Sequence, residues 1–121
     1  MNDCVFCKIV KGELPSYKLY EDDVVLVFLS IDPISNGHTL IIPKKHYTDY
    51  TDIDLDTLNH INMVGKKMYN LLNERLNFEG LKVVQNNGTL QEVKHYHMHL
   101  IPVYNEKEIS DLEDIYKKIK G

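Results

Sequence analysis

The sequence predicts an α+β fold in which a five-stranded antiparallel sheet packs against one long helix and a C-terminal helix. Three observations support this fold class. The strand-like segments come mostly in succession, one long amphipathic segment interrupts them only once, and a second helical segment follows the last strand. The 121 residues are enough for one hydrophobic core and too few for two. We therefore expect residues 1–121 to form a single domain.

Five segments have the composition of strands, because they are rich in β-branched and aromatic residues and end at turn residues. In chain order they are residues 17–20, 24–29, 38–43, 81–85 and 95–101. The first two are separated by three acidic residues and are expected to pair as a hairpin, while Pro43 ends the third. Asn86-Asn87-Gly88 supplies the turn chemistry before the last strand.

Two segments repeat apolar residues at three- and four-residue intervals, which is typical of amphipathic helices. The first covers residues 54–77, and either Asp52 or Asp54 can cap its N-terminus. The second begins near Ser110, which has capping-box spacing to Glu113. These segments are the long helix and the C-terminal helix of the predicted fold.

Charge and hydropathy exclude several classes of partner. A net charge of −4 argues against binding to a nucleic-acid backbone, which requires clustered Lys and Arg. The N-terminus, from Met1 to Cys4, has neither the basic start nor the apolar segment of a signal peptide. The longest apolar run, residues 24–29, is much too short to span a membrane. We expect a cytoplasmic protein without nucleic-acid or membrane partners.

His95-Tyr96-His97-Met98-His99 is the most informative motif of the chain. In a β-strand alternate side chains share a face, so the three imidazoles would line one face about 6 to 7 Å apart. Histidine serves near neutral pH as a nucleophile, a general acid or base, or a metal ligand. The less favoured alternative is a solvated strand face that happens to carry polar residues.

Both cysteines lie in Cys4-Val5-Phe6-Cys7, at a spacing typical of a metal site. A structural zinc needs two more ligands, for which His46 and one histidine of the triad are candidates. If that histidine is His95, the zinc would anchor the N-terminus to the sheet. Two alternatives stay open: a catalytic zinc held by His95, His97 and one more ligand, or two buried thiols without metal.

His97 is the favoured nucleophile, because it has a histidine on either side. An unprotonated imidazole nitrogen can attack phosphorus when the other ring nitrogen is held by a backbone carbonyl. His99, and His38 from a neighbouring strand, would stabilise phosphoryl oxygens or help the leaving group depart. For His38, an ordinary strand position is an equally supported alternative.

The triad and the following Leu100-Ile101 resemble the signature of the histidine triad (HIT) family. Residues 4–9, Tyr20-Glu21-Asp22, residues 37–46 and residues 86–88 also match the family in order and spacing, so the resemblance covers nearly the whole chain. The Hint-like branch of nucleoside phosphoramidases, with its zinc-containing bacterial members, is the most similar.

The resemblance implies a HIT-like fold and a hydrolase that cleaves purine nucleoside phosphoramidates, or related nucleoside monophosphate derivatives, at the α-phosphate. His97 would form a nucleotidyl-histidine, while His99 and His38 would contact the phosphate or the leaving group. A structural zinc would be bound by Cys4, Cys7, His46 and His95. The resemblance also implies a homodimer.

The resemblance further implies which residues bind the nucleotide. Asn86 would contact the phosphate or the ribose, and an apolar slot for the base would be formed by Phe6, Ile9, Phe28 and Ile31. Ser30 stands where Hint-like proteins usually carry a ribose-binding aspartate, and Asp32 would share its strand face if the extended backbone continues.

The loop before the triad is shorter than the Hint-like pattern. It retains Gln91, whereas Glu92 stands where a small hydroxyl often donates to the phosphate. A carboxylate there is expected to lower affinity or to favour a leaving group that bears an amine. Two other functions stay open, a dinucleoside polyphosphate hydrolase and a nucleotide-binding or interaction module with little turnover.

Overall fold

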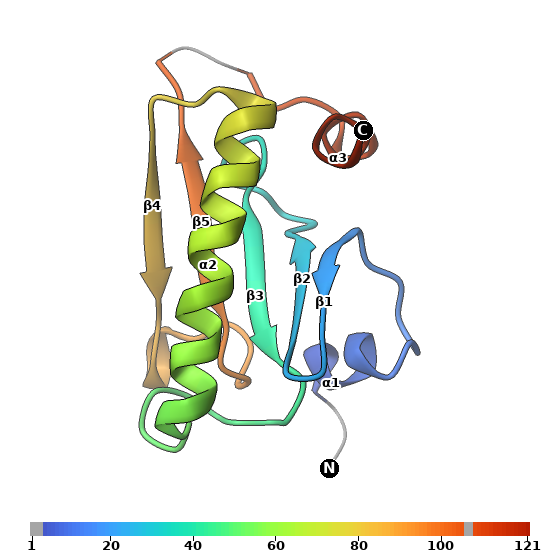
Figure 1. Cartoon of the computed structure of the whole chain (residues 1–121). Helices are drawn as coiled ribbons and strands as arrows, with labels where there is room; N and C mark the ends of the chain where they lie inside the picture. Colours follow the sequence, from blue (N-terminus) through green and yellow to red (C-terminus); the bar gives the residue numbers. More distant parts are fainter. Residues whose placement is uncertain (1–3, 106–107) are drawn as a thin grey trace.

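A computed structural model describes residues 4–105 and 108–121 and confirms the α+β fold (Figure 1). Five strands form one antiparallel sheet in the spatial order β1-β2-β3-β5-β4. They are β1 (Lys18–Glu21), β2 (Val25–Leu29), β3 (Thr39–Pro43), β4 (Gly80–Gln85) and β5 (Met98–Val103). The first three residues, on which the expectation of no signal peptide partly rests, lie outside the described residues.

The long helix α2 (Leu55–Leu76) lies across one face of the sheet, as Figure 1 shows. Asp54 caps it, since its carboxylate accepts the backbone N–H of Thr57 at 3.2 Å. Alternate residues of the strands pack under the helix, so Val25 and Val27 of β2 join Leu72 of α2 in the larger core. None of the helices in the described part of the chain has the length and apolar character needed to cross a membrane.

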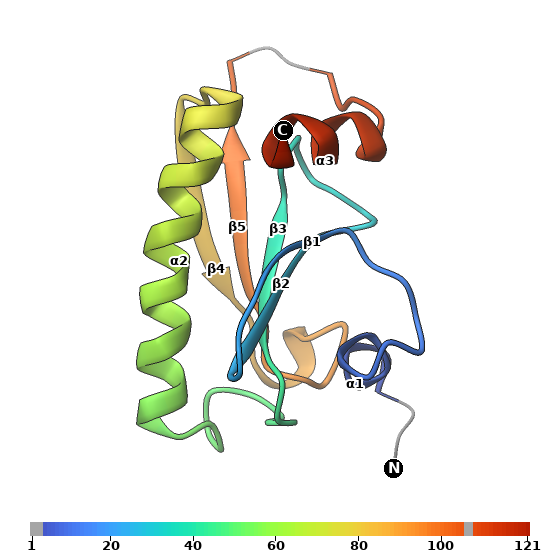
Figure 2. The same ribbon diagram turned by 45° about the vertical axis from the view of Figure 1, so that its right-hand side comes forward.

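The opposite face of the sheet is partly covered by a short helix, α1 (Val5–Val10), as Figure 2 shows. Cys4 caps α1, because its sulfur accepts the backbone N–H of Cys7 at 3.3 Å. The buried side chains of α1 form a second, smaller core with alternate residues of β2 and β3. Its members are Phe6, Ile9, Leu26, Phe28, Leu40 and Ile42. The sequence did not predict α1, because one and a half turns are too short for a helical repeat to show.

The C-terminal helix α3 (Leu112–Lys120) packs against α2 and β1 and adds Ile115 and Ile119 to the larger core. Its cap lies one residue later than the capping-box spacing predicts: Asp111 is the N-cap residue, and its side chain makes no capping bond. Just before α3, backbone groups of Glu108 and Ser110 bond to Asn36 in the loop between β2 and β3.

The last strand begins at Met98, so the prediction that residues 95–97 belong to it is wrong. Pairing with β3 begins at Met98, opposite Ile41. The preceding residues are instead bonded to the chain that follows β3, where the Tyr96 N–H donates to the Tyr47 carbonyl at 2.7 Å. Because of this bend, His95 and His97 lie before the strand, and only His99 of the triad lies within it.

Candidate active site

The three histidines of the triad form two groups and not one even row. The ring centroids of His97 and His99 lie 4.8 Å apart, which is closer than alternate positions of one strand. The His95 ring lies 4.8 Å from that of His46, which comes from the loop after β3. The bend before β5 therefore divides the triad between a cysteine-containing cluster and a histidine cluster.

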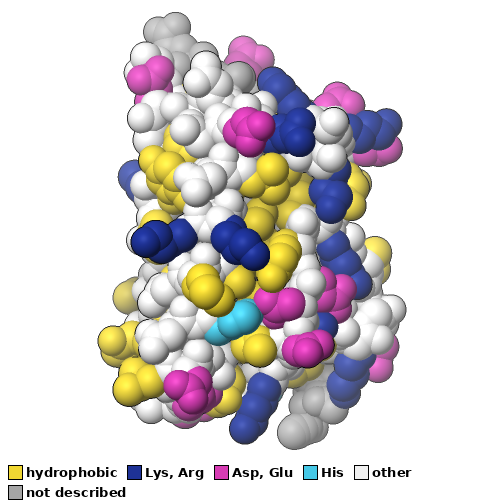
Figure 3. Space-filling view, in the orientation of Figure 1, with side chains coloured by type: hydrophobic (Ala, Val, Ile, Leu, Met, Phe, Trp, Pro, Cys, Tyr) yellow, Lys and Arg dark blue, Asp and Glu magenta, His cyan; other side chains and the backbone are white. Residues whose placement is uncertain are grey.

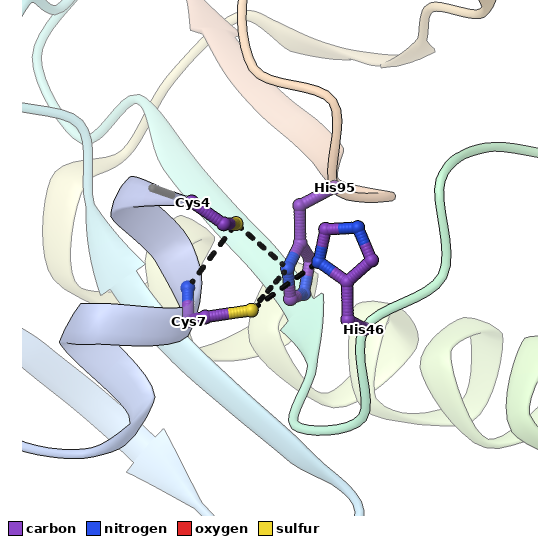
Figure 4. Close-up of side chains that lie close together, drawn as sticks. All are labelled: Cys4, Cys7, His46 and His95. Atoms are coloured by element: carbon purple, nitrogen blue, oxygen red, sulfur yellow. Dashed lines mark hydrogen bonds between the residues drawn. The ribbon is translucent and has the colours of Figure 1, made fainter. Parts of the chain in front are cut away.

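Cys4, Cys7, His46 and His95 are the one group in the described part of the chain with the arrangement of a metal site, and their ligand atoms lie within 4.8 Å of one another. Figure 4 shows the four side chains pointing toward one another from α1, from the loop after β3 and from the segment before β5. The sulfur of Cys7 lies 3.2 Å from Nδ1 of His46 and 3.6 Å from Nδ1 of His95. Tetrahedral zinc with ordinary bond lengths separates sulfur and nitrogen ligands by about 3.6 Å, so the residues present fit this metal.

The hydrogen bonds of His95 assign its tautomer. Its Nε2–H donates to the Pro43 carbonyl at 2.9 Å, which leaves Nδ1 unprotonated and directed at the two sulfurs. Burial lowers the pKa of this imidazole to about 4, so the ring is neutral. Burial, together with the neighbouring Cys4, raises the pKa of the Cys7 thiol, and a bound cation would offset this by favouring the thiolate.

His97 has the geometry of a nucleophile. Its Nδ1–H donates to the backbone carbonyl of His95 at 2.7 Å, so Nε2 keeps a free lone pair. The side chain is buried, and burial lowers its pKa, which keeps the ring neutral near pH 7. Its Nδ1 is already bonded, and His97 is outside the group with metal-site geometry. The structure therefore favours the zinc site built on His95 over the one that includes His97.

His38 and His99 form a hydrogen-bonded pair beside His97, with Nε2 of His38 2.9 Å from Nδ1 of His99. The backbone N–H of Ile34 donates to Nδ1 of His38 at 3.0 Å, so the proton of the neutral ring lies on Nε2. That proton is donated to His99, whose own proton must then lie on its Nε2. Burial lowers the pKa of both imidazoles, that of His99 to about 4, so both are neutral near pH 7.

Three of the four residues expected in the apolar slot lie together next to His97. The Phe6 ring packs edge-on against His97 at 5.1 Å and against Phe28 at 5.7 Å, and Ile9 is in the same cluster. Ile31 is 80% exposed and lies outside this buried cluster, so its expected place in the slot stays a prediction. The chain leaves the sheet after β2, and Ile31 lies in the loop that follows.

The two polar residues expected near the phosphate lie in the segment between β4 and β5. Gln91 is buried and donates from Nε2 to the Thr48 carbonyl at 2.7 Å, while its Oε1 is buried without a partner among the described residues. Asn86 is half-buried beside Asn87, whose side chain accepts the backbone N–H of Tyr50 at 2.8 Å. Gln91 and Asn87 thus join this segment to the loop after β3, a role that the sequence did not reveal.

The residues at which the chain departs from the Hint-like pattern lie near the paired histidines. Ser30 follows β2, and its hydroxyl accepts the Asp32 N–H at 3.2 Å. The exposed carboxylate of Asp32 acts electrostatically on His38, partly offsetting the effect of burial on its pKa. Glu92 is exposed and acts on His97 in the same direction. Asp32 and Glu92 therefore lie within electrostatic range of His38 and His97, respectively.

The HIT domain family model matches residues 11–106. The chain belongs to the HIT family. An uncharacterized HIT-like protein of Methanocaldococcus jannaschii is 42% identical over 129 aligned positions, which cover 98% of this chain and 99% of the relative. An adenosine 5'-monophosphoramidase of Candida albicans is 46% identical over 109 positions, 85% of this chain and 72% of the enzyme.

A solved structure supports both the HIT fold and the metal site. The zinc-bound histidine triad protein of Mycobacterium smegmatis is 35% identical, with a TM-score of 0.90 over 98% of this chain and 91% of that one. The sequence-based assignment to the HIT family and to its α+β fold is therefore confirmed. That relative is zinc-bound, and the four clustered side chains of this chain could hold a metal ion.

Proposed function

We propose that this HIT protein is a hydrolase that cleaves purine nucleoside phosphoramidates, or related nucleoside monophosphate derivatives, at the α-phosphate. The observation that carries the proposal is the hydrogen bond from Nδ1–H of His97 to the His95 carbonyl, because it leaves Nε2 of a buried, neutral ring unprotonated. The relative named as an adenosine 5'-monophosphoramidase supports this substrate class.

The proposed reaction has two displacements at phosphorus. Nε2 of His97 forms a bond to the α-phosphorus as the bond to the leaving group breaks, which gives a nucleotidyl-histidine, and the leaving group takes up a proton that the later hydrolysis step returns to solvent. Water then attacks the same phosphorus and releases the nucleoside monophosphate and the free imidazole. The Nε2–H of His99 donates a hydrogen bond to the phosphoryl oxygen or the leaving group, and His38 holds His99 in that tautomer.

The proposed nucleotide site extends from the histidines over the second core. Phe6, Ile9 and Phe28 would contact the base, since they form an apolar surface that reaches His97. Asn86 and Gln91 would contact the phosphate or the ribose, and the side-chain carbonyl oxygen of Gln91, which is buried without a partner among the described residues, could accept a hydrogen bond there. Ser30 and Asp32 would lie near the sugar, because Ser30 continues the face of β2 that carries Phe28.

Turnover of adenosine 5'-phosphoramidate tests the proposal. We expect release of AMP, a covalent adduct on His97 in rapid-quench mass spectrometry, and loss of turnover in His97→Ala. His60→Ala is the matched control, because His60 lies on α2 and bonds to Asp22 at 2.7 Å, outside the site. Robust turnover by His97→Ala would refute the assignment. Preferential cleavage of diadenosine tetraphosphate would favour a dinucleoside polyphosphate hydrolase, and AMP binding without turnover would favour a binding module.

We also propose that a structural zinc binds Cys4, Cys7, His46 and His95. When bound, it would link α1 to the segment before β5 and stabilise the folded state, while the reaction itself uses the histidines. Metal analysis of the purified protein should find one zinc per chain. Cys7→Ser should lower the metal content and the thermal midpoint, and an unchanged metal content would contradict this ligand set.

A homodimer is proposed from the face that carries α2. A groove of about 470 Å³ runs between α2 and the strands β4 and β5, and Tyr69 and Val83 at its rim are exposed. Figure 3 shows apolar side chains scattered among charged ones on this face. A second copy would bury them. Sedimentation should give twice the chain mass, and Val83→Lys should shift the protein toward the monomer.

The chain is further proposed to act in the cytoplasm as a single domain of residues 1–121. Both cysteines are free thiols, as expected in a reducing compartment. Fractionation of cells that produce the tagged protein would test the location.

A further inference from the structure

Asn36 joins the loop between β2 and β3 to a distant part of the chain. The residue is 4% exposed, and its side chain makes two hydrogen bonds to backbone groups before α3. Nδ2 donates to the Glu108 carbonyl at 3.0 Å, and Oδ1 accepts the Ser110 N–H at 2.8 Å. The amide thus pairs with the C-terminal segment as a neighbouring strand would. The position of the loop depends on residues more than 70 positions later.

Two further bonds join the same loop to the end of β5 and the residue that follows it. The Tyr104 hydroxyl donates to the Asn36 carbonyl at 2.7 Å, and the Ser35 hydroxyl donates to the Pro102 carbonyl at 2.5 Å. The space between the loop and α3 is a cavity of only about 10 Å³, which has His38 and Ile115 among its lining residues. A cavity of this size holds at most one water, so loop and helix are closely packed behind His38.

The same loop carries the donor that sets the tautomer of His38. The Ile34 N–H lies 3.0 Å from Nδ1 of His38, and Ile34 is two residues before Asn36. A backbone N–H can only donate, so this bond requires an unprotonated Nδ1. The His38 proton then lies on Nε2 and is donated to Nδ1 of His99, 2.9 Å away. A displacement of the loop would remove the one contact that distinguishes the two nitrogens of His38.

We propose that Asn36 is a positioning residue, which ties the loop to the C-terminal segment, holds the Ile34 N–H on His38 and so fixes the tautomers of His38 and His99. The tautomers follow from the geometry alone, whereas the consequence for catalysis rests on the proposed function. Without the amide bonds, His38 takes either neutral tautomer, and fewer molecules present Nε2–H of His99 to the phosphate. A smaller competent fraction lowers kcat and leaves KM nearly unchanged.

Asn36→Ala tests this in the full chain, with two readouts. Imidazole ¹⁵N chemical shifts should show one Nε2-protonated tautomer of His38 in the wild type and averaged values in the variant. Turnover of adenosine 5'-phosphoramidate should fall about twofold or more in kcat, in proportion to the loss of the competent tautomer, with little change in KM. Ser35→Ala removes one of the accompanying bonds and should shift both readouts less, in the same direction, even if Asn36→Ala folds poorly.

Ile119→Val is the matched control, because it loosens the packing of α3 and leaves the bonds of Asn36 in place. It should lower the thermal midpoint without changing the His38 shifts or kcat. Unchanged ¹⁵N shifts in Asn36→Ala would overturn the proposal, and so would equal losses of kcat in both variants. If the wild-type protein shows no turnover but Asn36→Ala gives averaged ¹⁵N shifts, the positioning role is supported and only the proposed function is contradicted.

Discussion

Gly37→Ala should be the most damaging conservative substitution near the site, for two separable reasons. Gly37 has a φ of +87°, and an L-residue in that region costs about 1 to 2 kcal/mol. A Cβ built there would lie 2.4 Å from Cδ1 of Leu76, a buried residue at the end of α2. Relieving that contact within a packed core costs a further 1 to 3 kcal/mol, by order of magnitude. We expect a loss of about 2 to 5 kcal/mol in the free energy of unfolding.

Urea unfolding of three variants separates the two terms. Gly12 has a φ of +81° with nothing within 4 Å of its added Cβ, so Gly12→Ala reports the backbone term alone. Gly65 lies inside α2 with ordinary 3.7 Å contacts, so Gly65→Ala should be neutral or slightly stabilising. Since Gly37 precedes His38, Gly37→Ala should also reduce kcat. The reasoning fails if Gly37→Ala costs no more stability than Gly12→Ala.

The remaining predictions concern pH and two carboxylates. Burial lowers the pKa of His99 to about 4 from an ordinary value near 6.5. Between these two pH values the unfolded chain binds more protons than the folded protein, so the free energy of unfolding should fall as the pH falls from about 6.5 to about 4. Urea unfolding at pH 7 and pH 5 checks this, and His99→Gln should reduce the slope; an unchanged slope would contradict the burial argument. The Asp22 carboxylate accepts hydrogen bonds from two backbone N–H groups, the Tyr20 hydroxyl and His60; the backbone donors are Val24 and Val25. Asp22→Asn should therefore lower the free energy of unfolding by about 1 to 3 kcal/mol and leave kcat unchanged. A loss of kcat without a loss of stability would contradict this structural role. Glu92→Ser should lower KM for a phosphoramidate or change the preference among leaving groups, and identical kinetics across several leaving groups would show that the carboxylate has no such role.

The fold was predictable because its main signals are local. β2 and β3 are continuous apolar runs, and the repeat in α2 extends over six turns, so neither depends on distant residues. The start of β5 was not predictable, since residues 95–97 are held away from the sheet by the Tyr47 carbonyl, nearly 50 positions earlier. Alternation in the sequence cannot reveal where a strand stops pairing.

The side chains of the candidate site were predictable, but their orientation was not. Spacing pointed to the two cysteines and to His97, and the resemblance to the HIT family implied His46 and His95 as the other two metal ligands. The structure brings these four ligands together. The tautomers depend on the Pro43 and His95 carbonyls and on the Ile34 N–H, which are backbone groups that every sequence contains. The exposure of Ile31 was not predictable, because the exposure of a loop residue depends on how the loop leaves the sheet.

Successive side chains of β5 point to opposite faces of the sheet. Met98 and Leu100 line the groove beside α2, whereas His99 between them bonds to His38. Any substitution of Met98 or Leu100 that is meant to probe subunit association therefore also disturbs the peptide units that carry a histidine of the site. Val83 on β4 and Asn62 on α2 border the same groove on separate elements, so changes there can report on association while the chemistry stays intact.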